Sequence, residues 1–158
     1  MICSQKFGYL KMLIRNADLS DLQDIFEWRN DSFSRSMFLS SEVVSLNEHI
    51  DWYQRSLKNP NRRIYIGLIN ELKIGLVRFD FDENTKKSEV SINLNPIFRS
   101  KGFGFTLLSK SISVYKQSKE TPLIATVKKE NGSSLRIFTK CGFDNKSEDD
   151  LCYHLIRS

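Results

Sequence analysis

The 158-residue sequence contains little cysteine, histidine, glycine or proline: three, two, seven and three residues, respectively. Three cysteines without a Cys-x-x-Cys pair do not suggest a disulfide framework, and two distant histidines do not suggest a zinc site. The small glycine and proline content, beside 40% hydrophobic residues, excludes a fibrous or disordered chain. We therefore expect one globular domain over residues 1–158, with reduced structural thiols and no bound metal.

The sequence also lacks a long apolar run. No segment approaches the roughly 18 consecutive apolar residues that a membrane helix needs. Residues 1–12 have neither the apolar core nor the cleavage site of a signal peptide. Residues 1–11 differ in composition from the rest of the chain and are interpreted as an N-terminal extension or a frayed strand. We expect a cytoplasmic protein without a membrane partner.

Charge of one sign is not concentrated anywhere in the chain. The 24 Lys and Arg residues exceed the 19 Asp and Glu residues by five, and the longest basic runs are pairs such as Arg62-Arg63. A nucleic-acid-binding protein would show a basic stripe or patch, so we expect no nucleic acid partner. A small anionic molecule explains the excess charge at least as well.

Hydrophobic periodicity predicts a mixed α/β protein. Ser20 with Gln23 and Ser45 with Glu48 have the spacing of capping boxes and predict two helix starts. Gly142 suits the left-handed end of a later helix. The predicted elements are a strand near 13–14, helices over 20–28 and 45–58, three antiparallel strands at 63–69, 73–79 and 89–94, a helix after Pro96, a strand at 123–127, a helix after Asn131 and a strand at 151–156.

The loop from Arg99 to Gly104 has the pattern RxxGxG and lies between a strand and a helix. Its glycines allow a tight turn whose N–H groups point outward at the positive end of a helix dipole, an arrangement that binds pyrophosphate. Arg99 and Lys101 add positive charge. Leu107 stands where a dinucleotide fingerprint needs a third glycine, and no Walker loop is present. A plain strand-to-helix turn is the alternative interpretation of this loop.

A second pattern, NxxSxxxxxKxGF, runs from Asn131 to Phe143. The two patterns, separated by a strand, resemble those of the GNAT superfamily of acetyl-CoA-dependent N-acetyltransferases, and the order of elements matches from residue 12 to the end. The resemblance implies an α+β fold with a mixed, mostly antiparallel, splayed sheet flanked by helices. It also implies acetyl-CoA as cofactor, a small-molecule amine as acceptor, and a homodimer as one oligomeric state that this fold supports.

The resemblance further implies how the cofactor is held. Leu94 and Asn95 would pair through their backbone with the pantetheine arm, and the loop and the start of the next helix would hold the pyrophosphate. Asn131 and Ser134 would line the thiol end, and Lys140 would approach the phosphates. The implied cofactor-binding residues are Leu94, Asn95, Arg99, Lys101, Gly102, Phe103, Gly104, Phe105, Thr106, Asn131, Ser134 and Lys140.

The N-terminal half resembles sugar-nucleotide amino N-acetyltransferases of the pseudaminic acid pathway in its Glu-Trp-Arg-Asn segment ending at Asn30. This resemblance implies a nucleotide-linked amino sugar as acceptor, with Arg29 and His49 at the nucleotide end and an apolar floor for the sugar. The implied substrate-binding residues are Arg29, Asn30, Met37, Phe38, Trp52 and Arg78. Met37, Phe38 and Trp52 are core residues in the alternative interpretation, Arg29 a surface cation, and His49 a partly exposed helix histidine. We assign Phe26 and Trp28 to the core.

The resemblance also bears on the catalytic groups. An amine must lose its proton before it attacks a thioester, and Glu89 and His49 are the candidate bases. Glu89 is otherwise an exposed carboxylate pairing with Lys87 or Arg78. Phe138 stands where relatives usually carry the tyrosine that protonates the leaving thiolate.

Tyr115, Tyr153 and Ser134 are the candidate replacements for that tyrosine. Two kinds of alternative function remain open: a protein N-terminal (ribosomal-type) or polyamine acetyltransferase, and a non-catalytic acetyl-CoA-binding module, for which Phe138 is the one positive sign.

Overall fold

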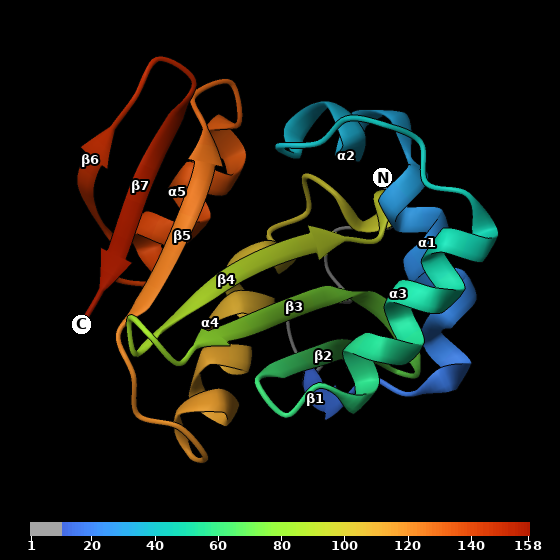
Figure 1. Ribbon diagram of the computed structural model, residues 1–158. Helices are drawn as coiled ribbons and strands as arrows, with labels where there is room; N and C mark the ends of the chain where they lie inside the picture. Colours follow the sequence, from blue (N-terminus) through green and yellow to red (C-terminus); the bar gives the residue numbers. More distant parts are fainter. Residues whose placement is uncertain (1–10) are drawn as a thin grey trace.

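The computed structural model describes residues 11–158, so the expected N-terminal extension lies, apart from Lys11, outside the described residues. The described chain contains one seven-stranded sheet with the order β1-β2-β3-β4-β5-β7-β6 (Figure 1). All neighbouring strands are antiparallel except β4 and β5. The strands are β1 (Leu13–Asn16), β2 (Arg62–Ile69), β3 (Leu72–Asp82), β4 (Lys87–Leu94), β5 (Leu123–Lys128), β6 (Asp144–Glu148) and β7 (Cys152–Arg157).

The helices cover both faces of this sheet, and each face has its own core. They are α1 (Leu22–Asn30), α2 (Ser32–Met37), α3 (Leu46–Lys58), α4 (Phe103–Lys116) and α5 (Gly132–Lys140). On β2, Ile64 and Ile66 pack with residues of α1 and α3, whereas Tyr65 and Ile69 pack with residues of α4. Because successive side chains of a strand point to opposite faces, α1 and α3 lie on one face and α4 on the other. None of the helices in residues 11–158 has the length and apolar character needed to cross a membrane.

β4 and β5 separate soon after they meet. Their pairing is limited to Ser88 with Leu123 and Glu89 with Ile124, and beyond this point the two strands diverge (Figure 1). The register of β3 with β4 continues to Leu94. The sheet is therefore splayed, as the resemblance implies, and one edge of β4 faces an opening rather than a strand among the described residues.

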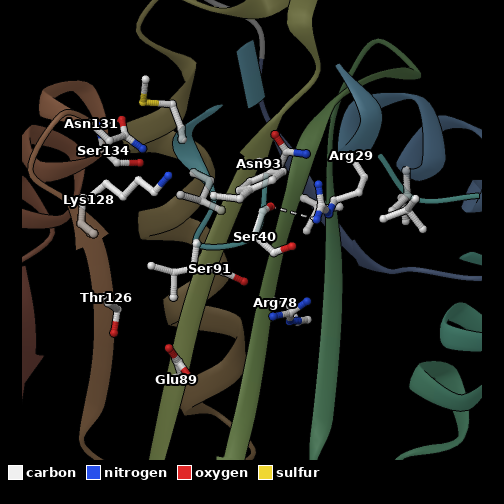
Figure 2. A pocket seen from close by; sticks show the side chains of 18 of the residues that line it. Arg29, Ser40, Arg78, Glu89, Ser91, Asn93, Thr126, Lys128, Asn131 and Ser134 are labelled. Atoms are coloured by element: carbon white, nitrogen blue, oxygen red, sulfur yellow. Dashed lines mark hydrogen bonds between the residues drawn. The ribbon is translucent and has the colours of Figure 1, made fainter. Parts of the chain in front are cut away.

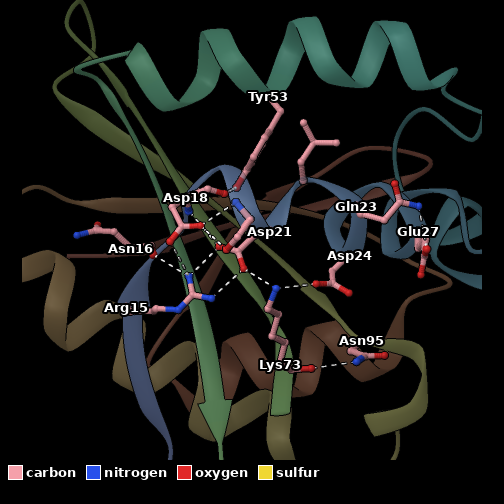
Figure 3. Close-up of polar contacts among 12 residues, drawn as sticks. Arg15, Asn16, Asp18, Asp21, Gln23, Asp24, Glu27, Tyr53, Lys73 and Asn95 are labelled. Carbon is pink, nitrogen blue, oxygen red and sulfur yellow. Dashed lines mark hydrogen bonds and ion pairs between the residues drawn. The ribbon is translucent and has the colours of Figure 1, made fainter. Parts of the chain in front are cut away.

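A buried ion cluster fixes α1 and α3 on the sheet (Figure 3). Asp21 is fully buried and accepts hydrogen bonds from Arg15 at 2.7 and 2.8 Å, while the Lys73 ammonium lies 2.8 Å from the same carboxylate. Burial alone would raise the pKa of Asp21, but these bonds from Arg15 and Lys73 lower it to about 2. Tyr53 of α3 donates to the carbonyl of Asp18 at 2.6 Å. The cluster thus connects β1, β3 and the elements that cover them.

Most predicted elements are confirmed, including the mixed, mostly antiparallel splayed sheet. Ser45 and Glu48 form the predicted capping box, and Gly142 has a left-handed φ of +86°. The predicted capping box of Ser20 and Gln23 is wrong. The capping box is formed instead by Asp18, whose carboxylate accepts from Ser20 N, and Asp21, and it caps a 3₁₀ turn that precedes α1. Two elements, α2 and β6, were not predicted. Every residue of β6 is exposed, so no hydrophobic alternation marks it.

Candidate active site

A cavity of about 700 Å³ lies on the sheet face that carries α1 and α3 (Figure 2). Its floor comes from β3, β4 and β5. Its walls come from α1, the end of α2, α3, α5 and the connection between α2 and α3, residues 38–45, which we name the cap segment. Nine of the predicted site residues line it: Arg29, Met37, Phe38, His49, Trp52, Arg78, Glu89, Asn131 and Ser134. The structure therefore brings most of the predicted acceptor residues and the thiol-end residues into one cavity.

The cavity floor is polar because of the two-residue period of its strands. On β4, Val90 belongs to the α4 core, so Glu89 and its alternate neighbours point to the other face, into the cavity. The same holds on β5, where Ala125 and Val127 are core residues. The floor residues that sequence reasoning missed are Ser91, Asn93, Thr126 and Lys128. Their polar alternation was the only signal, but it is equally typical of a solvent-facing strand.

The guanidinium of Arg29 uses only part of its hydrogen-bonding capacity in the part of the chain that the structure describes. Nη2 donates to the carbonyl of Ser40 at 3.2 Å, and the guanidinium carbon lies 4.8 Å from the centre of the Phe38 ring. Nη1 is buried and has no hydrogen-bond partner among the described residues. Burial lowers the pKa of Arg29, and the nearby charges of Arg35 and Arg78 lower it further. A buried N–H donor without an acceptor is costly, so this atom is suited to an anionic oxygen from a ligand.

A second cation, Arg78, lies on the floor of the cavity. Its Nε donates to Asp80 at 2.8 Å, and its guanidinium carbon lies 5.8 Å from the centre of the Trp52 ring. Arg78 therefore does not pair with Glu89, the partner considered from the sequence. Glu89 is exposed to the cavity and makes no ion pair with any described residue. Its carboxylate is therefore available to a ligand.

His49 lies against the cavity but is almost fully buried, at 2% exposure. Its Nε2 lies 3.0 Å from the carbonyl of Leu22, and its ring stacks on Tyr53 with centres 5.8 Å apart. Burial lowers the pKa of His49, an effect that the Leu22 carbonyl opposes and Arg29 reinforces. The ring is therefore neutral at pH 7 and donates through Nε2 to a backbone carbonyl. This environment differs from the exposed histidine considered from the sequence and supports neither the base role nor the nucleotide contact.

Asn30 holds the cap segment and does not line the cavity. Its side chain donates to the carbonyl of Val44 at 2.8 Å and accepts from the N–H of the same residue at 2.9 Å. The predicted substrate contact of Asn30 is thus replaced by a structural one. Trp28 is buried, as predicted, whereas Phe26 is only half-buried and lies beside His49.

The open edge of β4 gives a place for an extended ligand backbone. The N–H of Asn95 donates to the carbonyl of Ile74 at 2.8 Å, which shows that this residue faces β3. Hydrogen-bonding direction alternates along an antiparallel strand, so Ile92 and Leu94 direct their N–H and C=O groups toward the opening. The predicted backbone pairing therefore fits Leu94, and the prediction for Asn95 is wrong because its donor is already used.

The start of α4 is the second part of the expected cofactor site. Gly102 is its N-cap with φ +81°, and no side chain caps this end of the 14-residue helix. The helix dipole and the first-turn N–H groups, near Phe105 and Thr106, suit a phosphate. Lys101 is exposed on this loop. Lys140 is the last residue of α5, and its neighbour Cys141 contacts the carbonyl of Phe105 in the first turn of α4 through its thiol. The contact of Lys140 with the phosphates stays a prediction.

Two residues of this loop have roles that the sequence did not indicate. A Cβ at Gly104 would lie 2.5 Å from Cδ1 of Ile137, so glycine is required here for the close packing of α4 on α5. Arg99 turns toward α2, where it contacts Asp31 and donates to Ser34 Oγ at 2.5 Å. The side chain of Arg99 is therefore already occupied by protein groups.

The thiol end of the expected site lies at the start of α5. Asn131 caps this helix by accepting from Ser134 N at 3.1 Å. Phe138, one turn further on, also lines the cavity. Of the candidate replacements for the missing tyrosine, Tyr115 is buried with its hydroxyl 2.7 Å from Ser88 Oγ, and Tyr153 does not line the cavity. Ser134 is the candidate that does.

Comparison with known proteins decides the family. Residues 11–144 match the family described as the acetyltransferase (GNAT) domain. The chain belongs to the GNAT acetyltransferase family. This GNAT chain is 24% identical over 136 residues to the acetyltransferase PseH of Campylobacter jejuni, a match that covers 85% of this chain and 84% of that protein.

Solved structures share the fold of this GNAT chain. The spermidine N-acetyltransferase of Vibrio cholerae, solved with CoA and spermine, has a TM-score of 0.84 at 18% identity and covers 92% of this chain and 94% of its own. The ribosomal L7/L12 α-N-protein acetyltransferase RimL, solved with coenzyme A, has a TM-score of 0.79 at 14% identity, with 92% and 93% coverage. At these identities the likeness shows the fold alone.

The family fixes the reaction class of this GNAT chain. It is an acetyltransferase, and acetyl-CoA is the acetyl donor. The open edge of β4 and the uncapped start of α4 fit such a donor, which agrees with the prediction from the two sequence patterns. The non-catalytic module considered from the sequence is therefore not favoured.

Proposed function

We propose that this enzyme acetylates the primary amine of an acceptor that also carries an anionic group, with a nucleotide-linked amino sugar as the favoured acceptor. One observation carries the acceptor class: Nη1 of Arg29 on the cavity wall is buried and has no hydrogen-bond partner within residues 11–158. An acceptor phosphate oxygen would satisfy that donor through a charge-assisted hydrogen bond. Arg78, on the floor, adds a second positive charge. The similarity to PseH and the Trp-Arg-Asn segment support the same acceptor class.

The walls of the cavity suit the sugar and the nucleotide. Met37, Phe38 and Trp52 line it with apolar surface. Sugar rings present apolar faces between their hydroxyl groups, so such a wall fits one part of the acceptor. The hydroxyl and amide groups of the floor, Ser91 and Asn93, are suited to its polar part.

We assign the base to Glu89. An alkyl amine has a pKa of about 10.4, so most of it is protonated at pH 7 and cannot attack. Glu89 lies on the cavity floor without a cationic partner among the described residues, which leaves its carboxylate able to accept the proton directly or through a water molecule. General-base assistance of this kind contributes about 10²- to 10⁴-fold to rate.

Acetyl-CoA, when bound, supplies the acetyl thioester. The open N–H groups of Ile92 and Leu94 are the donors available to polarise its carbonyl. Phe138 offers no proton, but a thiol with a pKa near 8.5 leaves without strong assistance. We assign the hydroxyl of Ser134 to the site of the leaving thiolate, because Ser134 lines the cavity and lies on α5, one turn before Phe138.

The test is release of the CoA thiol in the presence of three acceptors: a UDP-linked 4-amino dideoxy sugar, spermidine, and a peptide with a free N-terminus. We expect turnover with the sugar nucleotide. Arg29→Met should raise the KM for that acceptor about 10- to 100-fold, which corresponds to one hydrogen bond to a charged group. Arg55→Met, on the exposed surface of α3, is the control and should leave KM unchanged.

A polyamine is the second candidate acceptor, because acidic residues also line the cavity. These residues are Glu42, Glu48 and Glu89, and the carboxylate of Glu48 also caps α3. Carboxylates attract a polycation, whereas Arg29 and Arg78 repel it. Turnover with spermidine alone, with Arg29→Met leaving KM unchanged or lower, would select the polyamine and overturn the anionic acceptor.

A further inference from the structure

Arg99 faces away from the phosphate loop to which it belongs. Its guanidinium contacts the Asp31 carboxylate and Ser34 Oγ, and its central carbon lies 4.9 Å from the centre of the Phe33 ring. All three partners lie at or within the first turn of α2. The side chain of Arg99 thus joins the loop before α4 to the start of α2, whose contacted residues are 65 to 68 positions away in the sequence.

The partners of Arg99 are themselves structural groups of α2. Asp31 is the N-cap of this helix and accepts from Ser34 N at 2.9 Å. Burial raises the pKa of Asp31, but the bonds from Ser34 N and from Arg99 outweigh it and hold the pKa below its usual value. Arg99 therefore meets a charged carboxylate at neutral pH, and the pair fixes the start of α2.

The contacts continue from α2 into the cavity. Ser34 is 5% exposed and its Oγ donates to Asn93 Oδ1 at 3.2 Å, and Asn93 belongs to the cavity floor. At the other end of α2, Met37 and Phe38 line the wall of the same cavity. A change at Arg99 is thereby transmitted to both the floor and the wall.

We propose that Arg99 is a positioning residue for the acceptor rather than a ligand of the cofactor phosphate. It holds α2 and the side chain of Asn93 in the arrangement that shapes the cavity. This inference rests on the proposed function, which makes the cavity the acceptor site. A phosphate ligand would need a guanidinium free to reach the start of α4, whereas this one is held by the Asp31 carboxylate and Ser34 Oγ.

The experiment compares Arg99→Gln, Asp31→Asn and the double variant. Asparagine keeps the ability to cap a helix, so Asp31→Asn removes mainly the ion pair. Each single variant should raise the acceptor KM about 10-fold with little change in the acetyl-CoA Kd measured by calorimetry. The double variant should be no worse than Arg99→Gln alone, because Arg99→Gln already removes the ion pair with Asp31. Arg99→Lys should not restore the KM, because an ammonium lacks the planar fork of donors.

Lys101→Gln on the same loop is the matched contrast. Lys101 is exposed and makes no ion pair within residues 11–158, so its substitution should weaken acetyl-CoA binding while leaving the acceptor KM unchanged. Hydrogen exchange of the α2 amides, measured without any acceptor, should accelerate in Arg99→Gln and Asp31→Asn but not in Lys101→Gln.

A roughly tenfold rise in the acetyl-CoA Kd of Arg99→Gln, together with unchanged α2 exchange, would overturn the proposal. The calorimetric and exchange measurements need no acceptor, so they decide the role of Arg99 even if the sugar nucleotide is not acetylated. Should Arg99→Gln fail to fold cooperatively, Ser34→Ala removes the contacts of Ser34 Oγ with both Arg99 and Asn93 while keeping the Arg99–Asp31 pair, and it is expected to raise the same KM.

Discussion

Substitution of Glu89 should lower kcat only at pH values where the acceptor amine is protonated and needs a base. Glu89→Gln should lower kcat about 100-fold at pH 7. The loss should shrink as the pH rises toward the amine pKa of about 10.4, because the acceptor then deprotonates without help. The measurement is the pH dependence of kcat for both proteins with the same acceptor.

The control for this substitution is Glu130→Gln, an exposed carboxylate outside the cavity. If Glu89→Gln lowers kcat equally at every pH, Glu89 is not the base and only shapes the cavity floor.

Substitution of Gly104 should lower stability through the packing of α4 on α5, independently of any effect on cofactor binding. Alanine normally stabilises a helix over glycine by about 1 kcal/mol, but the added Cβ meets Ile137 Cδ1 at 2.5 Å. Gly104→Ala should therefore lower the free energy of unfolding by about 1 kcal/mol. Ile137→Val removes that methyl group at a cost of about 1 kcal/mol.

Once the clash is removed the helix preference for alanine remains, so the double variant Gly104→Ala/Ile137→Val should be about 1 kcal/mol more stable than Ile137→Val alone. Urea unfolding of all four proteins measures this. Strictly additive losses would show that the clash is not the cause. At Gly102, where a Cβ would meet nothing, alanine should cost about 1 kcal/mol through its left-handed φ alone.

At the scale of the elements, the ion cluster around Asp21 should make the attachment of α1 and α3 sensitive to acid. The pKa of Asp21 falls from about 3.8 to about 2 on folding. Its contribution is therefore fully present above about pH 4 and is lost as the pH falls toward 2. A shift of this size corresponds to about 2 kcal/mol. Denaturant unfolding at pH 5 and pH 2.5 measures it.

Asp21→Asn should lose about 2 kcal/mol less between these two pH values than the unsubstituted protein, and Asp144→Asn, on exposed β6, should behave like the unsubstituted protein. Lys73→Met, which removes one partner, is the alternative if Asp21→Asn does not fold. An identical pH dependence of Asp21→Asn and the unsubstituted protein would show that Asp21 is not the responsible group.

The sequence predicts those elements whose ends or faces carry a local signal. Ser45 with Glu48 marks the start of α3 because capping is a contact within four residues. α2 has a local cap in Asp31 but is only six residues long and is held by Arg99, far away in the chain. β6 pairs with the neighbouring β7, but all of its residues are exposed. Neither element carries a hydrophobic period, so periodicity could not predict them.

The whole molecule should respond to acetyl-CoA at the open edge of β4. A ligand at 100 times its Kd stabilises the native state by about 2.7 kcal/mol, so Tm should rise by several degrees. Hydrogen exchange should slow at the amides of Ile92 and Leu94. The amides of Ser91 and Asn93 face β3 and serve as internal controls. Slowing at all four amides without preference would indicate general stabilisation rather than occupation of the edge.

The candidate site was predictable to the extent that it depends on the backbone or on family patterns. The start of α4 and Leu94 lie where the patterns imply. The environments of His49 and Asn30 were not predictable, because a histidine or an asparagine on an amphipathic helix gives no sign of which backbone carbonyl it will meet. The floor residue Lys128 was missed for a related reason. Only the meeting of β4 and β5 shows that this polar side chain lines a cavity and is not fully solvated.

The alternation along β4 separates two kinds of recognition on one strand. In the site that we propose, Ile92 and Leu94 offer main-chain atoms to the donor, and these atoms are the same whatever side chains the strand carries. Glu89, Ser91 and Asn93 offer side chains to the proposed acceptor. Mutations at the second set can therefore alter acceptor preference over evolutionary time without disturbing donor binding.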